Sequence, residues 1–194
     1  MKKLIFALFA GLLISFNTNI YAQEPELSPE RKQAIDSLAL EKVRDLSKYV
    51  KIVGSKDPPW SEANRVIDRA EELFSPDAEI GVSSLTTTKV AYYKVRQYLE
   101  RLMRLNYDRV EIDWYKIEYV SDLQRQPDGT YVGVITVFQT FKGYDKEGRL
   151  VYQDTTKKDI TVYVKRKETQ IGGRKIGFWD VLLGDMRVKE TTNK

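Results

Sequence analysis

Any catalysis by this chain would have to come from carboxylates and tyrosine hydroxyls, because the 194-residue sequence contains neither histidine nor cysteine. Histidine is the commonest general base, and zinc prefers imidazole and thiolate ligands. A carboxylate base with a hydroxyl donor for a developing oxyanion can still catalyse isomerisation or hydration. Asp113 or Asp180 can supply such a carboxylate, and Tyr93, Tyr119 or Tyr131 the hydroxyl.

Both aspartates also fit a position on the solvent side. Asp113 precedes Trp114, and Asp180 follows Trp179, in runs where polar and apolar residues alternate. Successive side chains of a strand point to opposite faces, so each carboxylate is expected to face away from its buried neighbour. We therefore predict no catalytic residue, no metal site and no cofactor, and keep catalysis by an aspartate as the alternative.

Aromatic side chains are the stronger functional signal, with 12 Tyr, 7 Phe and 3 Trp. Buried tyrosine and tryptophan need partners for their polar atoms, so a set of them suits a pocket for a semi-polar ligand or a contact face. Ordinary core packing explains any single one equally well. Nine lie on elements expected to surround a common interior: Tyr92, Tyr93, Tyr98, Trp114, Tyr119, Tyr131, Phe138, Tyr152 and Trp179. Six of them are predicted to bind a ligand: Tyr93, Trp114, Tyr119, Tyr131, Phe138 and Trp179.

The part of the sequence that must position these residues is a set of four β-type runs. They cover 109–123, 130–143, 149–167 and 175–189, and glycine-bearing turns separate them. Short turns between sequential runs predict an antiparallel meander. In the first run the alternation slips near Tyr115 or Lys116, which predicts a bulge that bends the strand.

Three helices are expected before this sheet. Ser28 can cap the first, which continues to Gly54, and Ser61 can cap the second, whose apolar stripe ends at Phe74. A short strand over 78–83 and a threonine-rich link over 86–88 follow. The third helix is expected to have its apolar residues between Ala91 and Leu105.

A group of cations accompanies the third and fourth runs: Lys157, Lys158, Lys165, Arg166, Lys167, Arg174 and Lys175. These side chains can form a basic rim for an acidic partner. Lysines also protect solvated sheet edges against aggregation, and we interpret the group in this way.

The N-terminal residues 1–22 have the basic, apolar and small-residue regions of a secretory signal peptide. Their removal leaves a lead-in over 23–28, a single domain over 29–189 and a polar tail over 190–194. Loss of Lys2 and Lys3 lowers the net charge from +4 to +2, and the remaining charges are interleaved, which gives no indication of nucleic acid binding. The mature chain is expected outside the cytoplasm with no stable membrane span.

The order of elements resembles that of the nuclear transport factor 2-like (NTF2-like, cystatin-like cone) superfamily. The resemblance covers residues 29–189 and includes the passage Phe74-Ser75-Pro76-Asp77-Ala78 from a helix into a strand. It implies an α+β fold in which N-terminal helices pack on a strongly bent antiparallel sheet that encloses a pocket. The ending Phe178–Asp185 is similar to exported Bacteroidetes proteins, which implies the periplasm or cell envelope of a Gram-negative bacterium.

The superfamily includes small enzymes, ligand carriers and interaction modules, so the fold alone assigns no activity. Without a catalytic set, we expect a non-catalytic binding module for a protein partner or a small ligand. A second copy of the chain, in a homodimer, is a further partner that the sequence leaves open. The alternative is a small cofactor-free isomerase or hydratase that uses an aspartate in the cone.

Overall fold

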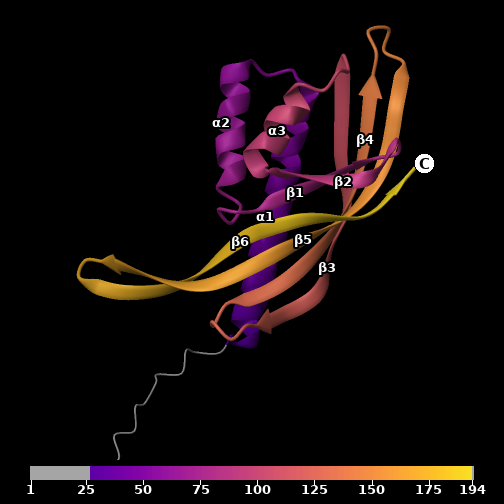
Figure 1. Ribbon diagram of the computed structural model, residues 1–194. Helices are drawn as coiled ribbons and strands as arrows, with labels where there is room; N and C mark the ends of the chain where they lie inside the picture. Colours follow the sequence, from indigo (N-terminus) through magenta and orange to yellow (C-terminus); the bar gives the residue numbers. More distant parts are fainter. Residues whose placement is uncertain (1–26, 194) are drawn as a thin grey trace, which may run out of the picture.

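The computed structural model describes residues 27–193, without the side chains of Thr87, Thr88, Tyr119 and Val120 (Figure 1). The predicted signal peptide lies outside the described residues. The helices are α1 (Pro29–Ser55), α2 (Trp60–Glu71) and α3 (Val95–Met103). The strands are β1 (Glu79–Ser84), β2 (Thr87–Lys94), β3 (Arg109–Arg125), β4 (Tyr131–Tyr144), β5 (Leu150–Ile171) and β6 (Arg174–Thr192).

A single six-stranded sheet has the order β2-β1-β6-β5-β4-β3. The four C-terminal strands form the predicted antiparallel meander, while β1 and β6 run parallel where Ile80 faces Met186. Gly129 and Gly148 occupy the hairpin turns at φ values of 82° and 75°, which glycine adopts without strain. The predicted fold class is confirmed: α+β, with N-terminal helices packed on a bent sheet.

A bulge bends β3 where the sequence predicts it. The pairing between β3 and β4 shifts between Tyr115 and Ile117, and Lys116 has a φ of 54°. Further shifts follow, among them one between Ile160 and Val162 that interrupts the pairing of β5 with β6. Such irregularities increase twist and curvature, so the sheet wraps around the helices instead of lying flat.

Helix α1 lies against the inner face of this sheet along its length (Figure 1). Ser28 caps it by accepting a hydrogen bond from the amide of Arg31, and Pro29 occupies its first turn, as predicted. Its fully buried stripe is Ala39, Val43, Leu46, Val50 and Val53. Burial of this stripe against the strands forms the centre of the core.

Two local expectations are wrong. Helix α2 begins at Trp60, and the carbonyl of Pro59 accepts from the amides of Glu62 and Ala63, so Ser61 lies inside the helix and does not cap it. The residues between the threonine-rich link and α3 form β2, which pairs with β1 in a hairpin. Valine, threonine and tyrosine, all strand-forming residues, fill that segment, and the partner strand determined its state.

Candidate functional site

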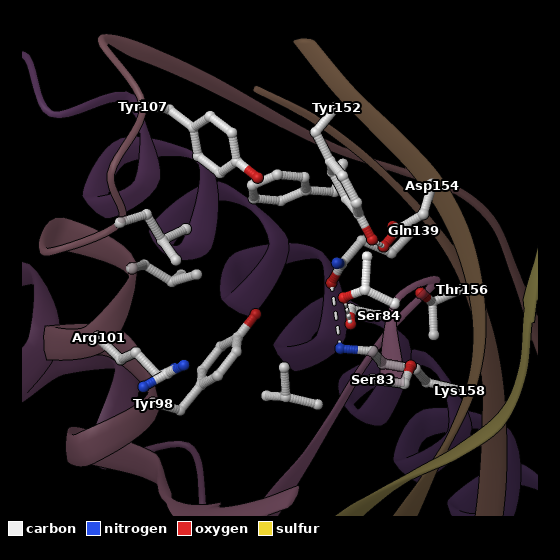
Figure 2. Close-up of a pocket in the computed structure, with 15 residues that line it drawn as sticks. Ser83, Ser84, Tyr98, Arg101, Tyr107, Gln139, Tyr152, Asp154, Thr156 and Lys158 are labelled. Carbon is white, nitrogen blue, oxygen red and sulfur yellow. Dashed lines mark hydrogen bonds between the residues drawn. The ribbon is translucent and has the colours of Figure 1, made fainter. Parts of the chain in front are cut away.

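A cavity of about 300 Å³ opens between α3 and the inner faces of β4 and β5 (Figure 2). Strand β1 and the turn after it close one side, and the segment from Leu105 to Tyr107 closes another. The residues that line it are Val82, Ser83, Ser84, Thr86, Tyr98, Arg101, Leu102, Leu105, Tyr107, Gln139, Phe141, Tyr152, Asp154, Thr156 and Lys158.

Lys158 lies deep in this cavity. Period-2 alternation places Asp154, Thr156 and Lys158 on the same face of β5 as the buried Ile160 and Val162. Only 3% of Lys158 is exposed, and its Nζ donates to Oε1 of Gln139 at 3.4 Å (Figure 2). Burial lowers the pKa of Lys158 to about 8, although the negative charge of Asp154 works in the opposite direction.

A carboxyl–phenol pair lies on the same strand. Oδ2 of Asp154 accepts a hydrogen bond of 2.6 Å from the hydroxyl of Tyr152, which in turn accepts from the amide of Leu85 at 3.2 Å. Asp154 is 4% exposed, and burial raises the pKa of its carboxyl group. Burial and the contact with Asp154 raise the pKa of Tyr152 to about 12, so the hydroxyl stays a donor at neutral pH.

Aromatic rings form the wall opposite α3. Tyr107, Phe141 and Tyr152 contact one another with ring centroids 5.7, 5.8 and 6.3 Å apart. Gly143 makes room for this cluster, because a Cβ there would lie 2.5 Å from the ring of Tyr107. The ammonium group of Lys56 donates to the carbonyl of Tyr107 at 2.6 Å and holds the segment in place.

The opposite wall comes from α3. The ring of Tyr98 is buried and lies 5.7 Å from Nζ of Lys158, while Leu102 supplies an apolar surface. Arg101 is exposed at the rim, where its guanidinium lies 5.2 Å from the centre of the Tyr93 ring. It makes no ion pair with any residue that the structure describes. The α3 wall and the aromatic wall are therefore mainly apolar, and the polar lining consists of an amine, an amide and a carboxyl group together with the hydroxyl groups of Ser83, Ser84, Thr86 and Thr156.

The predicted ligand-binding residues whose side chains the structure describes do not gather at one site. None of the five whose side chains are described lines this cavity. Tyr131 and Trp179 contact each other at 5.7 Å, and the hydroxyl of Tyr131 accepts from the amide of Leu27. Tyr93 lies at the rim beneath Arg101.

The other three of the six lie on β3 and β4. Phe138 contacts Tyr115 at 5.8 Å on the outer face of the sheet. Trp114 packs against the core, where its Nε1 is buried with no hydrogen-bond partner among the described residues. The side chain of Tyr119 is not among those described. As ligand contacts all six stay predictions, whereas Tyr98 and Tyr152, from the wider aromatic set, do line the cavity.

The two aspartates singled out for catalysis lie outside the cavity. Asp113 is exposed and pairs with Lys51 at 2.7 Å, and Asp180 pairs with Lys167 at 2.5 Å beside a shallow outer groove. The expected solvent-side position is confirmed for Asp113, whereas the side chain of Asp180 is 23% exposed and lines that groove. Among the described residues no cluster of acidic side chains could hold a metal ion.

Lys158 and Asp154 are the functional candidates that sequence reasoning missed. Lys158 had been assigned to the solvated basic group, and the structure corrects this, because Lys158 is buried while Lys157 points to the other face. A signal was present, since Lys158 shares its parity with Ile160, Val162 and Val164. A charged residue on the apolar face of a strand is costly and is a reason to expect a site.

None of the helices in the described part of the chain is both long and apolar enough to cross a bilayer. The comparisons with known proteins are sparse: no protein-family model matches the sequence, and no curated protein matches it.

The solved structures that are similar to this chain include the following two. One is a protein of Novosphingobium aromaticivorans, provisionally named a scytalone dehydratase, with a TM-score of 0.42 and 12% identity, covering 85% of this chain and 91% of that one. The other is a type 2 hexachlorocyclohexane dehydrochlorinase (LinA), with a TM-score of 0.39 and 14% identity, covering 82% and 91%. Both scores are low, so the chemistry of the cavity has to be inferred from the residues of this chain.

Proposed function

We propose that this protein binds a small amphipathic molecule in the cavity between α3 and the sheet. The polar end of the ligand lies against Lys158 and Gln139, and its apolar part lies against Tyr98, Leu102 and Phe141. The observation that carries the proposal is the burial of Lys158 with a single long hydrogen bond at 3.4 Å.

An ammonium group has three donors, and burial without a partner costs free energy. No ion pair with a described residue compensates this cost for Lys158. A fold that needed only stability would be served better by an apolar side chain at this position. A hydrogen-bond acceptor on a bound ligand would supply the missing partner of Nζ, which explains why a lysine occupies this position.

The size of the cavity limits the ligand. At about 300 Å³ it lies at the lower end of the range of roughly 300–1,000 Å³ for small-molecule sites. The walls are mainly apolar and aromatic, and the polar groups are gathered at one end, so a short hydrocarbon with one polar head fits best.

The test is a thermal-shift screen of short-chain alcohols, acids and carbonyl compounds against three forms of the residue 23–194 protein. Ligands should raise the melting temperature of the wild type and of Lys157→Met, in which the neighbouring lysine of the outer face is replaced. Lys158→Met should fold and lose the shift. Equal shifts in Lys158→Met and Lys157→Met would remove Lys158 from the site.

A cofactor-free isomerase or hydratase is the second candidate, and it is favoured by the buried Asp154. A carboxyl group whose pKa is raised by burial, with a phenol at 2.6 Å and an amine in the same cavity, provides groups that can donate and accept a proton. Asp154→Asn separates the two functions: turnover would fall while ligand binding persists. If the wild type converted no carbonyl or hydroxyl compound in a screen, the catalytic candidate would be rejected and only the binding function would remain.

We further propose that the protein acts outside the cytoplasm, in the envelope of a Gram-negative cell. The support is the three-part composition of residues 1–22. Expression of the full chain in a Gram-negative host, followed by fractionation and N-terminal sequencing, should give a periplasmic protein that begins near Gln23. Recovery of the intact chain in the cytoplasm would contradict export.

A further inference from the structure

An amine and a carboxyl group share the cavity without pairing with each other. Nζ of Lys158 donates to Gln139, and Asp154 accepts from Tyr152. Among the described residues no ion pair joins Lys158 to Asp154 or to any other acid. Figure 2 shows Lys158, Gln139, Asp154 and Tyr152 converging on the same space.

This arrangement differs from that of other lysines in the chain. Lys32 and Lys51, for example, form exposed ion pairs with Asp122 and Asp113, each at 2.8 Å or less. Pairing of that kind keeps an amine charged and unreactive. The amine of Lys158 instead lies in an enclosure with apolar sides that disfavours its charged form, and a neutral amine is a nucleophile.

We propose that Lys158 captures the carbonyl group of an aldehyde or ketone ligand as a reversible imine. The inference rests on the proposed binding function and names its ligand class. The lone pair of Nζ forms a bond with the carbonyl carbon, and the electron pair of the C=O π bond moves to the oxygen. The nitrogen loses its two protons overall, the oxygen leaves as water, and a C=N bond remains. No oxidant or reductant is needed.

The neighbouring groups suit both stages of this step. Oε1 of Gln139 accepts an N–H of the attacking amine, which fixes the direction of the nitrogen. Asp154 is buried, so its carboxyl group retains a proton more readily than an exposed one and can protonate the departing oxygen. Tyr152 holds that carboxyl group at 2.6 Å.

The same groups favour a neutral carbonyl compound over an acid. A ligand carboxylate at the floor of the cavity would bring a negative charge beside the carboxyl group of Asp154, where burial disfavours charge. Carbonyl carbon and oxygen fit between Lys158 and Asp154 without extra charge. The chain of the ligand then lies against Leu102 and Phe141, which line the cavity.

Octanal with sodium cyanoborohydride tests the proposal, because the reductant converts an imine into a stable octyl-amine. Peptide mass spectrometry of the residue 23–194 protein should find Lys158 labelled at least about tenfold faster than Lys157 at neutral pH. Lys158→Arg keeps a cation and should lose this label. Prior addition of 1-octanol to the wild type should slow labelling of Lys158 and leave Lys157 unchanged. This competition uses the wild type and decides the matter even if the variant fails to fold.

Thermal shifts with 1-octanol, which cannot form an imine, separate this proposal from the binding function. Stabilisation by octanol without selective labelling of Lys158 overturns the imine and leaves binding intact. Labelling spread evenly over surface lysines overturns it as well. Absence of both stabilisation and labelling counts against the binding function itself.

Discussion

At the scale of single residues, Lys158 occupies a buried position where its charge lowers the stability of the fold. The charged form of Lys158 is disfavoured by burial, and its one hydrogen bond, to Gln139, is long at 3.4 Å. Asp154 is buried on the same strand with its own pKa raised. Two costly ionisable groups in one cavity are typical of functional sites.

The first prediction follows from the lowered pKa of Lys158. Between pH 8 and pH 10.5 the native state has lost this proton while the unfolded state keeps it, so stability rises with pH in this window. From about pH 7 to about pH 9.5 the free energy of unfolding should rise by about 2 kcal/mol from this group. Urea titrations at several pH values measure it.

Lys158→Met should remove this rise and be more stable than the wild type at neutral pH, whereas Lys157→Met should keep it. Measurements stop near pH 9.5 because tyrosines act in the opposite direction above pH 10. The pKa of Tyr98 and of Tyr152 is raised by burial, and their contribution to stability is lost once unfolded tyrosine ionises. If the free energy of unfolding of the wild type changed with pH as little as that of Lys158→Met, Lys158 would have to be solvated.

A second prediction concerns Gly143, which the ring of Tyr107 covers. A Cβ at this position would lie 2.5 Å from the ring, so Gly143→Ala has to displace Tyr107 from the aromatic cluster. Overpacking of this kind costs about 1–3 kcal/mol. Gly177→Ala is the control, because its methyl group meets only the movable guanidinium of Arg166. If the two variants had the same denaturation midpoint, the ring of Tyr107 could not lie over Gly143.

How far the site could be predicted from the sequence depends on the residue. The face of Lys158 follows from the parity of β5 alone, so local reasoning was sufficient in principle. The contributions of Tyr98 and Arg101 depend on how α3 sits over the strands, which no local pattern states. Among the aromatic residues chosen from the sequence, Trp114 packs against the core whereas Phe138 lies on the outer face, because residues that share neighbouring strands need not share a face.

At the scale of elements, the spacing of apolar residues in α2 correctly predicted which face of the helix is buried. Ala63, Ile67 and Ala70 are fully buried, and the helix packs against α1 and α3. The turn that follows it is tied to the sheet, because the amide of Leu183 donates to the carbonyl of Leu73 at 2.8 Å. Helix α2 therefore holds α3 in position over the strands and supports one wall of the cavity indirectly.

The third prediction compares two substitutions on α2. Ile67→Ala should lower the free energy of unfolding by about 2–5 kcal/mol, because it removes buried methylene groups and leaves a cavity. Arg69→Ala removes only an exposed pair with Glu72 and should change it by no more than roughly 0.5 kcal/mol. Urea melts decide the matter, and similar midpoints would mean that the buried face is misplaced.

The elements were predictable where the signal is local. Ser28 with Pro29 specifies the start of α1, and the slip of alternation around Lys116 specifies the bulge in β3. Strand β2 was missed because its state depends on pairing with β1, which is a property of the hairpin. The parallel contact of β1 with β6 joins residues that are about a hundred positions apart, and it leaves no periodic trace in either segment.

At the scale of the whole molecule, the β5–β6 hairpin extends beyond the layer that the helices cover (Figure 1). Burial ends near Val164 and Val181, and the tip is exposed. Ile171, Ile176 and Phe178 have exposed fractions of 62%, 45% and 44%. The outer half of this hairpin therefore contributes little apolar burial to the stability of the domain.

The fourth prediction follows from this division of the hairpin. Replacement of Thr169–Ile176 by Asn-Gly places a two-residue turn between Glu168 and Gly177, which face each other in the pairing of β5 with β6. The free energy of unfolding should change by less than about 1 kcal/mol, because exposed residues are lost and the core is untouched. Urea melts and thermal shifts with ligands of the cavity measure the two properties.

Val181→Ala at the base of the same hairpin is the matched control. Val181 is 1% exposed, so this substitution should cost about 2 kcal/mol through lost burial and an incompletely filled space. A truncated protein that unfolds more readily than Val181→Ala would show that the outer hairpin is covered in solution, either by a second copy of the chain or by a contact within it. Sedimentation of the full-length and truncated forms then separates these two cases, since only a second copy changes the mass.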